Sequence, residues 1–595
     1  MDERSSLPLT YEELLARPAS EAEKLLAGLS FREQLQLVLS APWHLRPRII
    51  TLSPLAEGLV RNLPPQELFL TLKAVSTEEA VDLLAYAKGE QIQLIFDLDA
   101  WRKDRIVDER FLAWLVLLFE AGEDSVARWL RVADFDFLVA VLQRFIRVVK
   151  RPDDTDLTEA LDWLPPYTLD DTYFIEFRKK KFEFYFRRIV EIVRDMEETY
   201  YYNLMEALIW ELPSQVEEMA YRWRRGRLAD HGIPDYFDAL EVYAPLADGR
   251  LRQVDPRYLP GREPEEERGP QPGFLPVIHR PGAERFTLAL SRVSDPAQLD
   301  RLKRELAWIT NKVLTVDHIN LDEISQVEDS LNKVLGYLNI GLEYLAGPDP
   351  EAGARVLENY FLEDIFRLAH TLIVRLRKKA REISSQEGLD TRVLRHLDEP
   401  FASYLKGVTA REANRLKFYV PEKAGTAEEY RWFRELSEVR YVEDLLDMVG
   451  YWAPLIQRAF GPPPLWVAEI ATRRTNFLEP RDITWSALIL TALANWVCFG
   501  EFRFEALPVE KWPEALKHLL EPGPAGERNR FSGKLRETLH RNFRQLAQQT
   551  LYYAPEHTEN FLRFVTSRFE EEFAFAEPDS PPEPRYVRYL LIALD

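Results

Sequence analysis

The chain has 595 residues, too many for a single hydrophobic core, so we expect about three or four domains. Apolar residues make up 46% and charged residues 29% of the sequence, which argues against intrinsic disorder. The net charge of −21, from 77 basic and 98 acidic residues, disfavours binding to nucleic acid and to anionic membranes, so we expect no nucleic-acid partner.

Cysteine usage limits the chemistry further. Cys498 is the only cysteine, which excludes an intrachain disulfide and a zinc site built from several cysteines. It lies in the apolar run 494–499 (ANWVCF), where we expect an inert core thiol. The first ten residues lack the apolar stretch of a signal peptide. Together these features predict a cytoplasmic protein.

Residues 1–150 carry the pattern of short helices in close succession. Pro65 is placed to start a helix, and Ser76 with Glu79 has the spacing of a capping box. Asp108 and Asp134 are predicted N-caps of two further helices. The apolar face expected after Asp134 comprises Leu138, Val141, Leu142, Phe145, Val148 and Val149. Short helices separated by a few polar residues predict an irregular superhelical stack.

Three runs in this section carry a family resemblance. They are residues 53–60 (SPLAEGLV), 63–68 (LPPQEL) and 77–84 (TEEAVDLL). The pattern resembles the intracellular N-terminal helical domain of bacterial magnesium transporters, over about a fifth of the chain. In those transporters the domain is regulatory, so the resemblance implies a regulatory or interaction role. The transporters' membrane domain has no counterpart in this sequence.

Residues 151–246 are predicted to form a helical domain rich in aromatic residues and arginine. Its most unusual stretch is residues 221–234 (YRWRRGRLADHGIP), in which Gly232 is placed to end a helix and Pro234 to start the next. Together with the N-terminal stack and residues 397–401 (LDEPF), this stretch resembles a bacterial family known only as a domain of unknown function. The resemblance spans most of the chain and implies no particular activity.

A linker and a helical bundle are expected next. Residues 247–285 are dense in proline, glycine and charge, which predicts a mobile connector with a short extended piece near residues 274–278. Residues 286–424 then show apolar side chains at intervals of three and four, which predicts an antiparallel helical bundle. The three seams are Leu299, Leu302, Leu306, Ile309, Val313 and Val316; Ile324, Val327, Leu331, Val334, Leu338, Leu342 and Leu345; and Ile365, Ala369, Leu372, Leu376 and Ile383.

Residues 425–595 are predicted to form a C-terminal helical domain. Its expected core anchors are Trp432, Trp452, Trp466, Trp485 and Trp496. The uncharged run 483–500 has the length of a marginal membrane span. However, Thr484, Thr491 and Asn495 share one helical face, which favours a buried helix whose polar stripe bonds its neighbours. We therefore expect no integral membrane segment, and an all-α, multi-domain fold throughout.

No motif for catalysis, cofactor binding or metal binding emerges. Residues 526–534 (GERNRFSGK) approach a phosphate-binding loop, but the glycine spacing is wrong and Leu535 replaces the required hydroxyl. The nine histidines lie far apart and include no metalloprotease pattern. We therefore predict no catalytic residue, no metal ligand and no cofactor.

Basic clusters are the remaining candidates for a binding site. Residues 177–188 and 375–381 are interpreted as solvated faces. The better candidate for binding an anion or a partner comprises Trp223, Arg224, Arg225, Arg227, Asp230 and Asp235. Arginines beside a helix end can hold a phosphate or carboxylate bidentately. The alternative is internal pairing of these arginines with Asp230 or Asp235.

These observations favour a protein that acts by protein–protein contact, as a scaffold or regulator, with a protein partner. The sequence does not predict the oligomeric state. One alternative is an enzyme that acts on an anionic small molecule at the arginine-rich stretch. The other is a sensor of a ligand or divalent cation, by analogy with the transporter domain.

Overall fold

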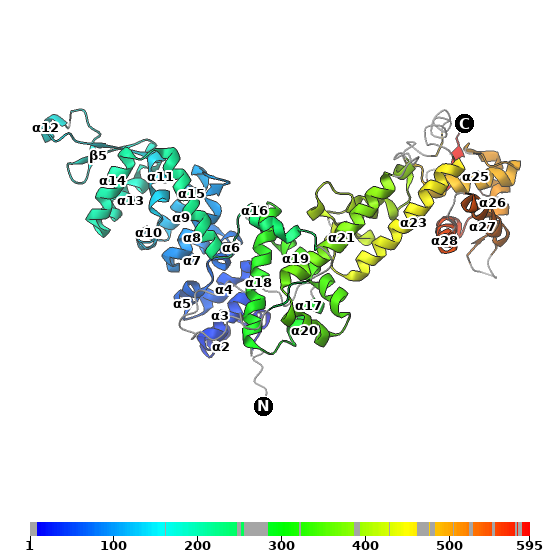
Figure 1. The fold of residues 1–595 in the computed structure, drawn as a ribbon, viewed down its shortest axis with the longest axis horizontal. Helices are drawn as coiled ribbons and strands as arrows, with labels where there is room; N and C mark the ends of the chain where they lie inside the picture. Colours follow the sequence, from blue (N-terminus) through cyan, green and yellow to red (C-terminus); the bar gives the residue numbers. More distant parts are fainter. Residues whose placement is uncertain are drawn as a thin grey trace. The chain divides into compact units, whose positions relative to one another are not determined.

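A computed structural model describes most of the chain. The described residues are 9–160, 162–246, 251–254, 284–320, 323–385, 393–427, 429–460, 475–476, 482–503, 505–522, 528–549, 554–577, 580, 583 and 586–594. They are mostly helical, with a few short strands, which confirms the all-α fold class (Figure 1). The chain divides into two compact units, Met1–Ala369 and His370–Asp595. The division falls within one helix, α21 (Leu362–Ser384).

Short helices begin the first unit. They are α1 (Tyr11–Leu15), α2 (Ala19–Ala27), α3 (Phe31–Ser40), α4 (Arg46–Leu52), α5 (Ala56–Asn62), α6 (Pro65–Lys73), α7 (Thr77–Tyr86), α8 (Gly89–Asp99), α9 (Asp108–Glu120), α10 (Glu123–Leu130) and α11 (Phe135–Phe145). The capping box of Ser76 and Glu79 is present, and Asp134 caps α11 by accepting from the Phe137 N–H at 2.8 Å. The predicted cap at Asp108 is wrong, because its carboxylate pairs with Arg144 at 2.9 Å instead.

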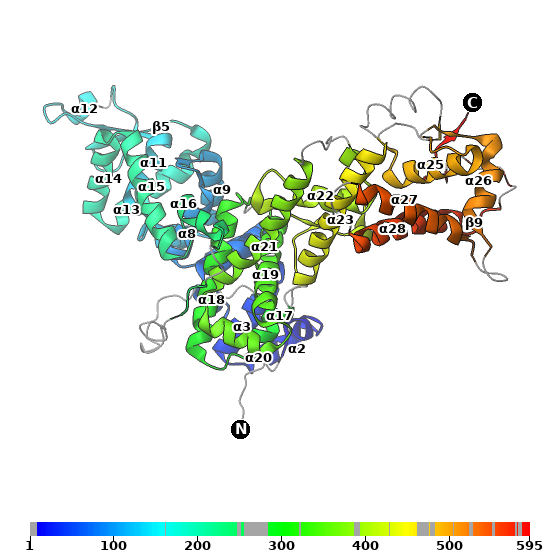
Figure 2. The ribbon, with the colours of Figure 1, turned by 45° about the vertical axis from the view of Figure 1, so that its right-hand side comes forward.

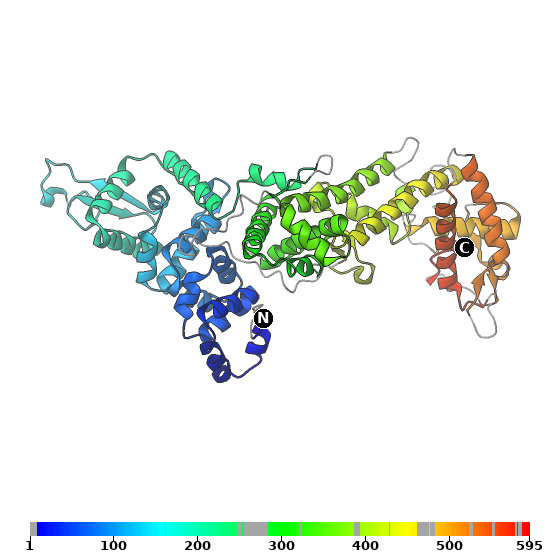
Figure 3. The same cartoon turned by 60° about the horizontal axis from the view of Figure 1, so that its bottom comes forward.

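A small antiparallel sheet interrupts the helices. Helix α11 ends at Phe145, and β3 (Ile146–Lys150) follows directly. It pairs with β5 (Tyr173–Phe177), which also pairs with β4 (Tyr167–Thr168). The prediction that Val148 and Val149 continue the α11 helix is therefore wrong. These β-branched side chains lie opposite Ile175 and Phe174 in a strand, where they pack well. In Figure 3 the cyan strands lie away from the blue N-terminal helices.

Further helices cover this sheet and the stack: α12 (Leu157–Ala160), α13 (Glu183–Met196), α14 (Glu198–Trp210), α15 (Pro213–Asp230) and α16 (Tyr236–Ala239). Helix α15 packs along α11 (Figure 1). Helix α15 ends just before Gly232, which has a positive φ of 73°. Glycine adopts this backbone conformation readily, so the helix end predicted at Gly232 is confirmed.

The predicted bundle seams become long helices. They are α18 (Pro296–Val316), α19 (Ile324–Ala346) and α21, joined by the shorter α17 (Glu284–Leu290) and α20 (Pro350–Asn359). Most of the predicted linker, including residues 274–278, lies outside the described residues. Its described parts are residues 251–254 and residues 284–285, which begin α17. Residues 251–254 are anchored, because Arg252 donates to the buried Asp364 carboxylate at 2.9 Å. This ion pair fixes residues 251–254 against α21, whereas the sequence predicted a mobile connector there.

The second unit is built from α22 (Phe401–Val408), α23 (Leu436–Phe460), α25 (Trp485–Phe499), α26 (Trp512–Leu519), α27 (Gly533–Gln548) and α28 (Pro555–Phe573). Helices α27 and α28 lie side by side (Figure 2). Two-residue strands complete both units: β1 (Trp101–Arg102), β2 (Arg105–Ile106), β6 (Phe418–Tyr419), β7 (Tyr430–Arg431), β8 (Leu507–Pro508), β9 (Leu520–Glu521), β10 (Arg530–Phe531) and β11 (Ile592–Ala593).

Helix α25 confirms the buried helix predicted for the uncharged run. All its residues from Trp485 to Asn495 are buried. Its polar stripe bonds neighbouring segments: the Thr491 hydroxyl accepts from the Leu591 N–H at 2.9 Å, and Asn495 donates to two backbone carbonyls. None of the described helices combines the length and apolar character that a membrane span requires.

Candidate interaction surface and groove

Arg227 points into the first unit and joins three helices. Its guanidinium is bidentate to the Asp97 carboxylate on α8, at 2.7 and 3.0 Å. A third N–H donates to Asp134, the cap of α11, at 2.7 Å. Asp97 is fully buried, so its carboxylate requires a cationic partner to offset the loss of hydration.

Arg224, one turn earlier, also faces inward. Its Nε donates to the Asp97 backbone carbonyl at 2.6 Å, and its guanidinium lies 5.3 Å from the ring centroid of Trp101. Burial lowers the pKa of Arg224 to about 10, so the side chain remains charged at neutral pH. Arg224 and Arg227, which were predicted to bind an anion, thus already bind Asp97 and Asp134 within the first unit.

The other predicted residues lie at the surface. Arg225 pairs with Asp235 at 3.2 Å, as the internal-pairing alternative expected. Asp230 is exposed and makes no ion pair with another described residue. Trp223 approaches the Asp136 carboxylate at the start of α11, while more than half of the residue is exposed to solvent. The structure therefore does not gather the six residues into one site.

An exposed apolar row runs along α15 and begins at its N-cap. Leu212, Met219 and Trp223 are spaced by seven and four residues, so they lie on one face of the helix. Their exposed fractions are 58%, 40% and 56%, and Trp210, at the end of α14, is 74% exposed. We call Leu212, Met219 and Trp223 the α15 stripe.

Charges beside the α15 stripe change sign along the helix. Glu218 lies in the first half, and Arg222 and Arg225 in the second. Glu218 and Arg222 pair with each other, and both side chains are more than half exposed. Gly226 continues the stripe by one turn, and a Cβ added there would meet no atom within 4 Å.

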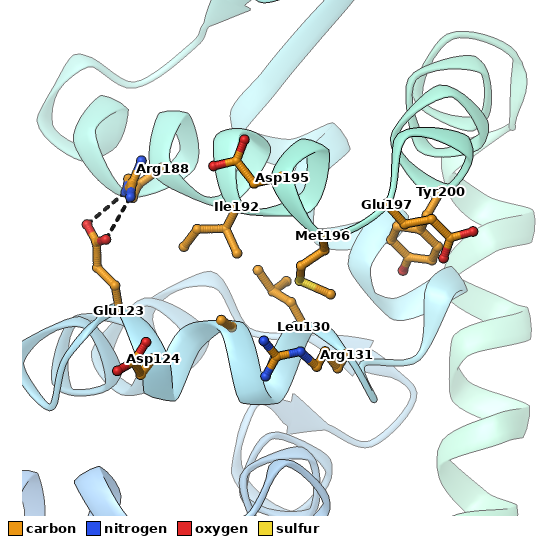
Figure 4. A pocket seen from close by; sticks show the side chains of 11 residues that line it. Glu123, Asp124, Leu130, Arg131, Arg188, Ile192, Asp195, Met196, Glu197 and Tyr200 are labelled. Atoms are coloured by element: carbon orange, nitrogen blue, oxygen red, sulfur yellow. Dashed lines mark hydrogen bonds and ion pairs between the residues drawn. The ribbon is translucent and has the colours of Figure 1, made fainter.

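A groove of about 630 Å³ lies between α10 and α13 and reaches the first turn of α14 (Figure 4). Its floor is apolar and is formed by Ala127, Leu130, Ile192 and Met196. The size is that of a site for a small molecule or for a few side chains of a peptide.

Charged side chains surround this floor. At one end Arg188 is bidentate to Glu123 at 2.8 and 2.7 Å, and this hydrogen bonding lowers the pKa of Glu123 (Figure 4). The other charged lining residues make no ion pair with a residue that the structure describes; they are Asp124, Arg131, Asp195 and Glu197. Three carboxylates against one guanidinium leave the groove negatively charged.

Tyr200 closes the groove at its α14 end. Its hydroxyl is buried and has no hydrogen-bond partner among the described residues. Burial raises its pKa to about 12, so the phenol stays neutral and can both donate and accept. The groove can thus hold an apolar chain that carries a positive charge.

A second hollow of about 530 Å³ lies at the C-terminal end of α15, with Arg225, Asp235, Trp308 and Lys312 among its lining residues. Lys312 is buried and pairs with Glu363 at 2.8 Å. Arg222 lines the hollow as well and pairs with Glu218, so all three of its cationic side chains are already paired and offer an anion little free charge. Over the described part of the chain, no group of three His, Cys, Asp or Glu side chains is placed to hold a metal ion.

In a comparison with known protein families, residues 23–593 match the model of a family of unknown function, DUF6178. The chain belongs to the DUF6178 family. The resemblance to a domain-of-unknown-function family is therefore confirmed. No curated protein and no solved structure matches this DUF6178 chain. The resemblance of its N-terminal section to magnesium transporters stays a prediction.

Sequence reasoning found the arginine-rich helix of this DUF6178 chain but missed the α15 stripe and the groove. The stripe left a signal, because Leu212, Met219 and Trp223 have helical spacing that the surrounding charges obscured. The groove left none, because α10 and α13 are separated by more than fifty residues and meet only in the folded chain.

Proposed function

We propose that this protein acts by protein–protein contact and that the α15 stripe is its contact surface. The observation that carries the proposal is the exposure of Leu212, Met219 and Trp223 in one row, with Trp210 beside the start of the helix. The sequence features that favour a cytoplasmic, non-enzymatic scaffold or regulator support the same proposal.

Exposing aromatic rings to water costs free energy, which a partner that covers them would recover. Trp210 and Trp223 each expose more than half of their surface, whereas tryptophan is highly buried on average. Tryptophan is also among the residues that contribute most to binding when an interface covers them. A partner that covers Trp223 would remove this apolar surface from water without any change in the α15 backbone.

The test is capture of a partner by the full-length chain from its native cells, with and without Met219→Asp. We expect a stoichiometric partner, either a second copy or another protein, that Met219→Asp removes. Leu288→Asp is the matched control, because Leu288 is also half exposed, in the same unit, but on α17. A partner that survives Met219→Asp, or that both substitutions remove, would contradict the proposal.

The groove supports a second candidate function, binding of a small organic cation. Its apolar floor suits an alkyl chain, its unpaired carboxylates suit a protonated amine, and the Tyr200 hydroxyl lacks a partner. We infer that an aliphatic oligoamine is the ligand class that fits these groups.

Calorimetric titration with spermidine tests this second function. The triple variant Asp124→Asn, Asp195→Asn, Glu197→Gln should weaken binding about tenfold, because each exposed charge contact contributes up to about 1 kcal/mol. The control Glu78→Gln, Asp82→Asn, Glu90→Gln removes the same charge from exposed positions on α7 and α8 and should leave binding unchanged. Equal weakening by both triples, or no binding to the wild type, would show that the groove is not an amine site.

A further inference from the structure

We propose that the partner on the α15 stripe is a second copy of this chain, packed so that the two α15 helices run antiparallel about a two-fold axis at Met219. The inference rests on the proposed function, since it names the partner for the same surface. Closed two-fold dimers are the commonest assemblies of identical chains, and such an interface must be complementary to itself.

The sizes of the side chains along α15 meet this requirement. Around an axis at Met219, residues at equal distances before and after that position lie opposite each other across the pair. Leu212 therefore lies opposite Gly226 of the second copy, so a large side chain meets a position without one. Gln215 lies opposite Trp223, and the two Met219 side chains, which adapt readily to a neighbour, meet at the axis.

Gly226 gives the second copy room to approach. Glycine in a helix interior costs stability relative to alanine, and the surroundings of Gly226 do not require it, because a Cβ there would touch nothing within 4 Å. Packed helices lie about 8–10 Å apart, and small residues permit the closer end of this range. The α15 helix of a second copy would fill the open space beside Gly226.

The charges fix the direction of the pair. In an antiparallel pair Glu218 of one copy lies beside Arg222 and Arg225 of the other, along the same flank of the stripe. In a parallel two-fold pair the charged flanks of the two helices lie on opposite sides, so Glu218 meets neither arginine of the other copy and these attractions are lost. The sign change along α15 therefore favours the antiparallel arrangement.

Sedimentation velocity of the full-length chain tests for the dimer. We expect a monomer–dimer equilibrium in the wild type and at least a tenfold higher dissociation constant for Met219→Asp. Gly226→Gln should raise the dissociation constant as well, because its larger side chain fills the space that the second copy needs. Glutamine is a good helix former, so the thermal stability of this variant should not fall. Leu288→Asp should leave the equilibrium unchanged. A wild type that remains monomeric at high concentration would overturn the inference.

Cysteine cross-linking tests the register. In a Cys498→Ser background, Met219→Cys should form a disulfide-linked dimer with itself. Trp223→Cys should not, but should cross-link to Gln215→Cys when the two variants are mixed. Self-cross-linking of Trp223→Cys without that of Met219→Cys would overturn the antiparallel register.

The two proposals fail in distinguishable ways. If the wild type is monomeric but captures a different protein in a Met219-dependent manner, only the inference of a second copy fails. If neither self-association nor capture of another protein depends on Met219, both the inference of a second copy and the proposed function fail.

Discussion

At the scale of single residues, the interior of the first unit depends on a few buried charges that hold distant segments together. Asp97 and Arg227 are the clearest pair, because the carboxylate is fully buried and receives two charged hydrogen bonds. A buried ion pair contributes little net stability, but loss of one partner leaves the other charge without compensation.

We therefore expect Arg227→Ala to lower the free energy of unfolding by about 3 kcal/mol, through the unpaired Asp97 carboxylate. Arg225→Ala is the matched control on the same helix. Arg225 is about half exposed in its pair with Asp235, so the loss should stay below about 1 kcal/mol. Chemical denaturation followed by circular dichroism measures both values. Equal losses in the two variants would contradict the structural role of Arg227.

Asp398 in the second unit adds a dependence on pH. Burial raises its pKa from 3.8 to about 6, although it accepts from the Ser486 N–H at the start of α25. Because the folded state holds the proton more tightly, this contribution to stability is complete below pH 3.8 and is lost as the pH rises through about 6.

Asp398→Asn should remove that loss, because an asparagine oxygen can still accept from Ser486. We expect the variant to gain up to about 3 kcal/mol over the wild type between pH 4 and pH 7. The measured quantity must be the difference in stability between the variant and the wild type at each pH. Burial lowers the pKa of His396, which makes the stability of both proteins rise with pH and would otherwise mask the effect of Asp398. A difference in melting temperature that is constant with pH would refute this assignment.

At the scale of elements, local signals in the sequence predicted the helices well where the chain supplied its own caps. Ser76, Asp134 and Gly232 each act within a few residues, so their effect could be read from the sequence. Asp108 has the same local pattern, but a distant arginine, Arg144, takes its carboxylate. The strand β3 was missed because its apolar residues also fit the helical period of α11.

The partners of Arg227 show the same limit for the candidate site. Asp97 is 130 residues away in the chain and belongs to another helix, so local spacing favoured Asp230 and Asp235 instead. The sequence therefore pointed to the helix that carries the candidate surface, but two of the six residues predicted to bind there, Arg224 and Arg227, point inward.

Close packing of α19 against α21 gives a prediction for an element. A Cβ at Gly341 would lie 2.4 Å from the Ile365 carbonyl oxygen, so Gly341→Ala must push the two helices apart. We expect a loss of about 2 kcal/mol in the free energy of unfolding, typical of overpacking.

Gly226→Ala is the control in the same unit. It has open space around it and should raise stability by about 0.5–1 kcal/mol, through helix propensity. Thermal melts of both variants, at a concentration where the chain is monomeric, decide between these outcomes. A Gly341→Ala variant as stable as the wild type would show that the helices do not approach so closely.

At the scale of the whole molecule, two compact units each contain their own buried residues. We expect calorimetry to resolve two unfolding transitions, since separate cores unfold as separate cooperative units. Arg227→Ala should lower the temperature of one transition, and Asp398→Asn at neutral pH should raise that of the other. A single transition that both substitutions shift would indicate that the chain unfolds as one unit.

Strand β11 has a consequence for the order in which the second unit forms on the ribosome. Leu590, Leu591 and Ile592 are completely buried, and β11 pairs in parallel with β8, more than eighty residues earlier. Helix α25 therefore stays without its full cover until these residues have been translated, although chains generally fold from the N-terminal side as they are made. During that interval its uncharged surface is exposed to solvent, which makes the partly made second unit prone to aggregation.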